Sequence, residues 1–178
     1  DFTEYLKPDT KLVAFSVSDV INAAAELLRD KIRSASITLE IHGDSTLISY
    51  GYRNSLYHVI LNVLGNAIDA ISEKGAGSGL ISVDMHRSET EPGRLMIEIF
   101  NDGVPLSDSA QRNLFKPYYT TKSGSDGTGL GLAISRHFIE ESMDGKIALE
   151  NCSGGVKCTI IINEHPQHTK CPRSAKQR

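Results

Sequence analysis

The sequence predicts a single domain that combines α-helices with β-strands. The clearest helix covers residues 55–73, where apolar side chains recur every three or four positions and form a wide stripe. Two pairs of segments alternate apolar and polar residues around a turn, as β-hairpins do: residues 80–86 with 95–100, and residues 146–150 with 156–163. The chain has 178 residues, 39% of them hydrophobic and 23% charged, which suffices for one core in an ordinary globular domain.

The segment before the long helix alternates between strand and helix patterns. Pro8 stops a helical end over residues 1–7, and Ser18 or Asp19 is positioned to cap a helix with apolar residues on one face. The further elements expected here are an edge strand over 11–17, a helix over 20–33, and strands over 36–41 and 46–50 separated by a turn.

The long helix carries two asparagines, Asn62 and Asn66, which are four residues apart and therefore share one face. Asparagine is a mediocre helix former, so a pair beside an apolar stripe calls for a reason. The spacing alone leaves two interpretations open: two amides bonded to solvent or backbone, or two amides directed at a ligand. A flexible, glycine-rich connection over residues 75–79 follows the helix.

A turn, a short helix and an aromatic loop follow the first hairpin. Asn101-Asp102-Gly103-Val104-Pro105 ends its second strand, a polar helix is expected over 107–114, and an aromatic loop over 115–119. Residues 120–126 are polar and contain glycine, which favours a mobile segment that closes over a ligand.

Glycines alternate in Gly127-Thr128-Gly129-Leu130-Gly131-Leu132, and a helical pattern begins at the last of them. The first N–H groups of a helix and its dipole favour an anion such as a phosphate. The run matches neither the dinucleotide-binding G-x-G-x-x-G fingerprint nor a Walker A loop. By itself it is equally compatible with a plain glycine-rich turn.

Composition argues against several classes of function. The formal net charge is −3, so no broad basic field is available for nucleic acid, and an anionic ligand needs a local site. Cys152, Cys158 and Cys171 are odd in number and lack paired spacing, which favours a reducing, cytoplasmic setting without disulfides or structural zinc. No apolar run reaches the about 18 residues of a membrane span, and no signal peptide opens the chain. Since the chain starts without Met, we expect a piece of a longer protein, which is not the anchor if that protein is membrane-bound.

Four short motifs stand in a fixed order, and together they resemble a known family. They are Asn62-Val63-Leu64-Gly65-Asn66-Ala67, Asn101-Asp102-Gly103-Val104-Pro105, Phe115-Lys116-Pro117-Tyr118 and Gly127-Thr128-Gly129-Leu130-Gly131-Leu132. They resemble the N, G1, F and G2 boxes of the ATP-binding catalytic domain of bacterial sensor histidine kinases, within the wider family of gyrase-type and heat-shock-chaperone ATPases. Asn66-Ala67-Ile68-Asp69-Ala70 looks most like the nitrogen-regulation type of kinase.

The resemblance implies an α+β fold, a two-layer α/β sandwich in which a mixed sheet packs on about three helices. It also implies that ATP and Mg²⁺ bind between the N-box helix and the polar segment, with Asn66 as the Mg²⁺ ligand and Asn62 close to the phosphates. Lys122 would add a positive charge, while Phe115 and Tyr118 would anchor the polar segment by packing. The residues expected at the nucleotide are Asn62, Asn66, Asn101, Gly103, Lys122, Gly127, Thr128, Gly129, Leu130, Gly131 and Thr159.

Two features depart from the commonest pattern of the family. The commonest G1 box has an Asp at the position of Asn101, which accepts a hydrogen bond from the adenine amino group, and a Gly at the position of Pro105. A neutral amide oxygen is a weaker acceptor, so we expect weaker nucleotide affinity. Thr159 matches a family Thr near adenine and is expected to contribute to binding the base. In the chaperone and gyrase relatives a water-activating Glu stands at the position of Asn62. An amide is no base, so the resemblance implies a phosphoryl donor rather than an ATPase.

The resemblance also divides the chain and suggests partners. It implies the end of a dimerisation helix with a linker (1–14), a catalytic domain (15–163) and a disordered basic tail (164–178). No histidine stands in the context of the family's phosphoacceptor, and His58 is expected to be a partly exposed helix residue. The resemblance therefore implies an acceptor histidine outside this chain. Expected partners are the dimerisation and phosphoacceptor domain and a response regulator, without nucleic acid or membrane insertion. Two alternatives stay open: a regulatory module that binds nucleotide weakly or not at all, and a serine kinase of the same fold.

Overall fold

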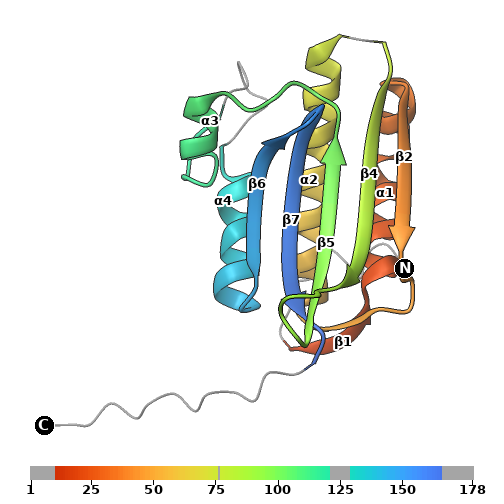
Figure 1. Cartoon of the computed structure of the whole chain (residues 1–178), viewed down its shortest axis with the longest axis vertical. Helices are drawn as coiled ribbons and strands as arrows, with labels where there is room; N and C mark the ends of the chain where they lie inside the picture. The colour runs from red at the N-terminus through yellow and green to blue at the C-terminus, as the bar shows by residue number, and fades with distance from the viewer. Residues whose placement is uncertain (1–10, 76, 121–128, 166–178) are drawn as a thin grey trace, which may run out of the picture.

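The computed structural model describes residues 11–75, 77–120 and 129–165, and these residues form two layers (Figure 1). One layer is a five-stranded sheet, whose strands in spatial order are β2 (Ile37–Gly43), β4 (Gly79–Arg87), β5 (Arg94–Asn101), β7 (Gly155–Asn163) and β6 (Lys146–Cys152). β2 runs parallel to β4, and the other neighbouring strands are antiparallel. The sheet is therefore mixed, and both hairpins form as the alternating patterns predict.

The second layer is helical and covers one face of this sheet (Figure 1). Its members are α1 (Val17–Ser34), α2 (Arg53–Lys74), α4 (Gly131–Arg136) and the π-helical turn η2 (His137–Ser142), which continues α4. α2 packs between α1 and α4, while the short α3 (Asp108–Asn113) lies to one side of the sheet (Figure 1). The expected two-layer α/β sandwich is confirmed.

A second, smaller sheet was not expected. β1 (Val13–Ser16) pairs antiparallel with β3 (Ile48–Gly51), and neither strand joins the large sheet. The predicted strand over 46–50 starts two residues late because the preceding turn extends into it. The Asp44 carboxylate accepts hydrogen bonds from the Thr46 N–H (2.9 Å) and from the Thr46 hydroxyl (2.6 Å), which holds that turn.

The first helix begins earlier than its sequence indicates. Neither Ser18 nor Asp19 is the N-cap, because α1 starts at Val17 and Ser16 Oγ accepts the Asp19 N–H at 3.2 Å. Val17 is fully buried, and its N–H donates to the Leu47 carbonyl at 3.1 Å, so tertiary packing fixes the start. Ser18 is buried as well, and its hydroxyl donates to the Ser45 carbonyl at 3.1 Å.

The core fills the space between the sheet and the helices. α2 supplies the predicted apolar stripe, and its eight members are all buried: Leu56, Val59, Ile60, Val63, Leu64, Ala67, Ile68 and Ile71. Alternate residues of the central strands face this stripe: Ile81, Val83, Met85, Leu95, Ile97, Ile99, Cys158, Ile160 and Ile162. The core thus fixes the position of α2 relative to the strand ends.

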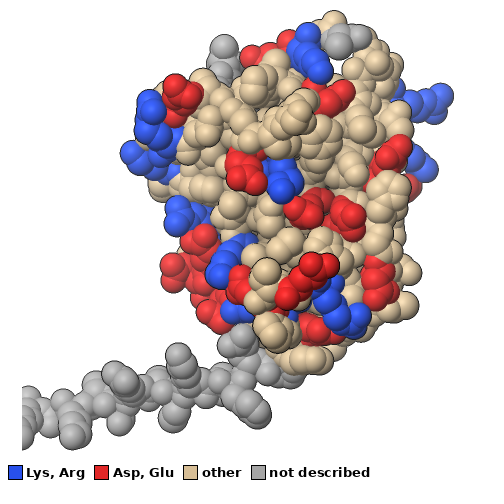
Figure 2. All heavy atoms as spheres, viewed as in Figure 1, with Lys and Arg blue, Asp and Glu red and all other residues tan. Residues whose placement is uncertain are grey.

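The opposite face of the sheet is open to solvent. Figure 2, drawn from the strand side, shows Lys and Arg interspersed with Asp and Glu on this face. Lys157 on β7 pairs here with Glu98 (3.2 Å) and Glu150 (3.7 Å). No helix in the described ranges is long and apolar enough to span a bilayer.

Candidate functional site

The candidate site is built on one face of α2. Asn62, Asn66 and Ala70 follow one another at intervals of four residues, so they line up along the helix. Both asparagines are half-buried. One end of this row touches α4, and the other touches the turn after β5, which places Asn66 between two segments that are far apart in the sequence.

At one end of the row, Asn62 joins α2 to α4. The Asn62 Nδ2 donates to Ser135 Oγ at 3.0 Å, and this hydroxyl donates to the Gly131 carbonyl at 2.9 Å. Ser135 is only 2% exposed. The two segments approach so closely that a Cβ at Gly131 would overlap Asn62 Oδ1. Only glycine fits there, so the glycine run and the N-box helix meet at this point.

The glycine run also returns to the aromatic loop. Gly129 has φ +65°, and a Cβ there would overlap the backbone of Tyr118, so this position requires glycine for two reasons. Phe115 packs on the core, and the Arg136 guanidinium lies 5.4 Å from the centre of its ring. Tyr118 does not pack: its side chain is 78% exposed. Phe115 is therefore packed and Tyr118, where the loop turns with φ +64°, is exposed. The expected packing of both against the polar segment involves residues 121–126, which lie outside the described residues.

At the other end of the row, the turn after β5 rests on α2. The Val104 N–H donates to the Ala70 carbonyl at 3.1 Å. Asn101 is only 7% exposed; its Oδ1 accepts the Gly103 N–H at 3.1 Å, and its Nδ2 donates to the Val156 carbonyl at 3.4 Å. The Asp102 carboxylate has a structural role, because its Oδ1 accepts a hydrogen bond from the Leu80 N–H at 2.8 Å. The Asn101 side chain is thus fixed on both sides at the end of its strand.

Thr159 does not join this group, and its expected place near adenine is wrong. Buried Cys158 and Ile160 point toward the helices, so Thr159 between them points to the opposite face of β7. Its cross-strand partner is Glu98, which takes part in the ion pair with Lys157 on the open face. The strand residue paired with Asn101 on the helix side is Val156.

Of the residues predicted from the sequence, the structure places Asn62 against Gly131, and Gly103 against Asn101 and Ala70, with Asn66 on α2 between these two contacts. Gly129 and Leu130 directly precede Gly131 in the glycine run. Lys122, Gly127 and Thr128 lie outside the described residues, as do 121–126 of the polar segment, the 1–7 helical end and residues 166–178 of the tail. His58 is exposed on α2, as expected. Ser135 and Ala70 were not predicted from the sequence. Ser135 is four residues after Gly131, and Ala70 is four residues after Asn66, so each shares a helix face with a predicted residue. This spacing does not show which helices pack against each other.

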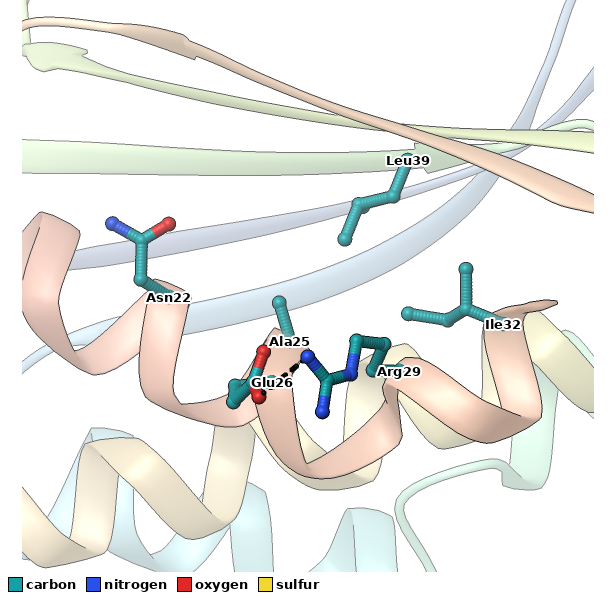
Figure 3. A pocket seen from close by; sticks show the side chains of 6 residues that line it. All are labelled: Asn22, Ala25, Glu26, Arg29, Ile32 and Leu39. Carbon is teal, nitrogen blue, oxygen red and sulfur yellow. Dashed lines mark ion pairs between the residues drawn. The ribbon is translucent and has the colours of Figure 1, made fainter.

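A groove elsewhere on the molecule is separate from the candidate site. It lies between α1 and β2, has a volume of about 510 Å³, and is lined by Asn22, Ala25, Glu26, Arg29, Ile32 and Leu39 (Figure 3). The Arg29 and Glu26 side chains pair with each other at 3.1 Å. None of the residues of the candidate site lines this groove.

The layered fold and the four motifs define the class of protein. The sequence profile of the histidine kinase-, DNA gyrase B- and HSP90-like ATPases matches residues 51–167, so the chain belongs to this family. Its structure is similar to the catalytic domain of the histidine kinase ThkA, with a TM-score of 0.76 and 28% identity over 87% of this chain and 97% of that one. The fold of a histidine kinase catalytic domain is therefore shown.

Proteins with similar sequences are also named as kinases. The sensor histidine kinase ZraS of Salmonella typhi is 32% identical over 165 residues, which is 91% of this chain and 34% of ZraS. Sporulation kinase B of Bacillus subtilis is 30% identical over 126 residues, which is 71% of this chain and 28% of that kinase. The chain thus spans about a third of the length of these relatives.

Proposed function

We propose that this chain is the catalytic domain of a sensor histidine kinase and donates the γ-phosphoryl group of MgATP to a histidine outside it. The observation that carries the proposal is the row on α2. Asn66 stands between the glycine run at Gly131 and the turn at Gly103, so the three nucleotide-binding motifs converge on one helix face. We further propose the division into 1–14, 15–163 and 164–178.

Asn62 supports transfer rather than hydrolysis. A general base must accept a proton, and the amide of Asn62 has no basic atom. Its Nδ2 is engaged with Ser135, so the side chain acts as a structural link between α2 and α4. Phosphoryl transfer depends mainly on positioning and charge neutralisation, and the attacking group comes from the acceptor.

The residues present fit a Mg²⁺ ion that arrives with the nucleotide. Among the described residues, no group of three or more His, Cys, Asp or Glu could hold a metal by itself. Mg²⁺ favours oxygen ligands, keeps several waters and takes others from phosphates, so one amide oxygen suffices from the protein. We assign that role to Asn66, where the metal would neutralise phosphate charge.

The proposed function also requires an acceptor histidine and a downstream protein partner. Of the described histidines, His58 lies on α2, four residues before Asn62, and its side chain is exposed. ThkA has been solved in complex with the response regulator protein TrrA. We propose a response regulator as the downstream partner here too, and the dimerisation domain of the whole protein as the site of the acceptor histidine.

Labelled ATP tests the reaction. The chain alone should show neither rapid hydrolysis nor self-labelling, whereas adding the dimerisation domain of the same kinase should place acid-labile, base-stable label on that domain. Asn66→Ala should abolish the labelling because the metal ligand is lost. His58→Ala is the control on the same helix and should retain most of it.

Two outcomes would overturn the proposal. Acid-stable label on the partner would indicate a serine kinase. Rapid hydrolysis without transfer would indicate an ATPase, and would require a base other than Asn62.

A further inference from the structure

The amide of Asn101 has only one orientation that its neighbours allow. The Gly103 N–H can only donate and the Val156 carbonyl can only accept. Oδ1 therefore lies toward Gly103 (3.1 Å) and Nδ2 toward Val156 (3.4 Å). Turning the amide over would oppose two donors on one side and two acceptors on the other, and the residue is 93% buried, so water offers little compensation.

This orientation identifies the atom at which Asn101 differs from a carboxylate. An Asp in the same place would keep one oxygen on the Gly103 N–H, and its second oxygen would stand where Nδ2 is. The atom at that position would then be an acceptor only, whereas Nδ2 carries two N–H groups. One of these donates to the Val156 carbonyl, and the described residues offer no acceptor for the other.

The substituent at position 6 of a purine base determines whether the base pairs with a carboxylate or with an amide N–H. A 6-amino group donates hydrogen bonds, so it pairs with a carboxylate and opposes an amide N–H. A 6-oxo group accepts them, so it pairs with an amide N–H and opposes a carboxylate. A buried donor that faces another donor, or a buried acceptor that faces another acceptor, forms no hydrogen bond. The free-energy cost of removing that group from water is then not compensated.

We propose that Asn101 sets the base specificity of this site, so that 6-oxopurine nucleotides bind at least as tightly as 6-aminopurine nucleotides. This inference rests on the proposed function, because it requires the base of a nucleotide to lie at Asn101. The donor substrate is then a purine nucleoside triphosphate, with inosine and guanosine triphosphates accepted alongside ATP.

Inosine triphosphate provides the sharpest comparison, because it differs from ATP only in having the 6-oxo group and a proton on N1. Titration calorimetry with Mg²⁺ gives Kd for both nucleotides with the 178-residue chain. For the wild type, the inosine triphosphate should bind at least as tightly as ATP. Asn101→Asp should reverse this order and shift the ratio of the two Kd values about tenfold or more, because a charged acceptor replaces the donor.

Asn163→Asp is the matched control. Asn163 is buried at the opposite end of β7, and its Nδ2 donates to the Met143 carbonyl at 2.9 Å. The same amide-to-acid change there should leave the ratio of the two Kd values unchanged. If Asn101→Asp does not fold, the ratio measured for the wild type decides the question alone.

The outcomes separate this inference from the proposed function. Tighter binding of ATP than of inosine triphosphate by the wild type overturns the inference and leaves the nucleotide site intact. An unchanged ratio in a folded Asn101→Asp variant overturns it as well. Binding of neither nucleotide overturns the proposed function, and the inference with it.

Discussion

The glycine run illustrates how strongly a single position is constrained at this site. Gly131 has no room for a side chain, because Asn62 Oδ1 occupies the place of its Cβ. Overpacking of this kind costs about 1–3 kcal/mol. We therefore expect Gly131→Ala to lower the free energy of unfolding by that amount and to weaken nucleotide binding, as chemical denaturation and calorimetry would show.

Gly65 is the matched control, since it lies inside α2 and a Cβ there meets nothing within 4 Å. Alanine is the better helix former, so Gly65→Ala should raise the free energy of unfolding by about 0.5–1 kcal/mol. Equal effects of the two substitutions would mean that close packing does not explain Gly131.

The cysteines should differ in reactivity. Burial raises the pKa of the Cys158 thiol well above its ordinary value, and Cys152 is exposed. Each unit of pKa lowers the reactive thiolate fraction about tenfold, so Cys158 should be alkylated at least about tenfold more slowly than Cys152 near pH 8. Mass spectrometry after timed iodoacetamide treatment measures this. Comparable rates in the native protein would contradict the burial of Cys158, and both should react once denaturant is added.

Between elements, the hydrogen bonds of Ser135 connect the N-box helix to the helix after the glycine run. If Asn62 and Ser135 act through each other, their effects on stability are not additive. A double-mutant cycle of Asn62→Ala and Ser135→Ala should give a coupling of about 0.5–1.5 kcal/mol in the free energy of unfolding.

Ser72 supplies the control for this cycle. Its hydroxyl also donates to a backbone carbonyl four residues back, that of Ile68, but the bond stays within α2. Ser72→Ala should therefore be additive with Asn62→Ala. Additivity in both cycles would mean that α2 and α4 are held by apolar packing alone.

For the whole molecule, nucleotide binding and folding are linked. A ligand at a hundred times its Kd stabilises the native state by about 2.7 kcal/mol. For a chain of this size that corresponds to a rise in Tm of roughly 5–10 °C. MgATP should produce this rise in a thermal scan. Absence of any shift at several millimolar nucleotide would favour the alternative of a regulatory module that does not bind nucleotide.

Much of the architecture follows from local patterns. The stripe of α2 and the alternation of the hairpins are properties of consecutive residues, so the sequence predicts them and the core confirms them. The start of α1 and the small sheet of β1 with β3 were not predicted. Both depend on partners distant in the sequence, Leu47 for Val17 and β3 for β1, which no local window contains.

The sequence by itself determined the family, because four motifs in a fixed order carry more information than any one of them, and it determined which side chains are available at the site. Only the tertiary structure decided how they are used. Sheet pairing and strand alternation turn Thr159 away from the site, and the Gly103 N–H with the Val156 carbonyl orient the Asn101 amide. The packing of α4 on α2 brings Ser135 to Asn62, whose Nδ2 donates a hydrogen bond to the Ser135 hydroxyl. The physical reason is that hydrogen bonds are directional and act over about 3 Å, so the role of a polar side chain depends on neighbours that only the fold supplies.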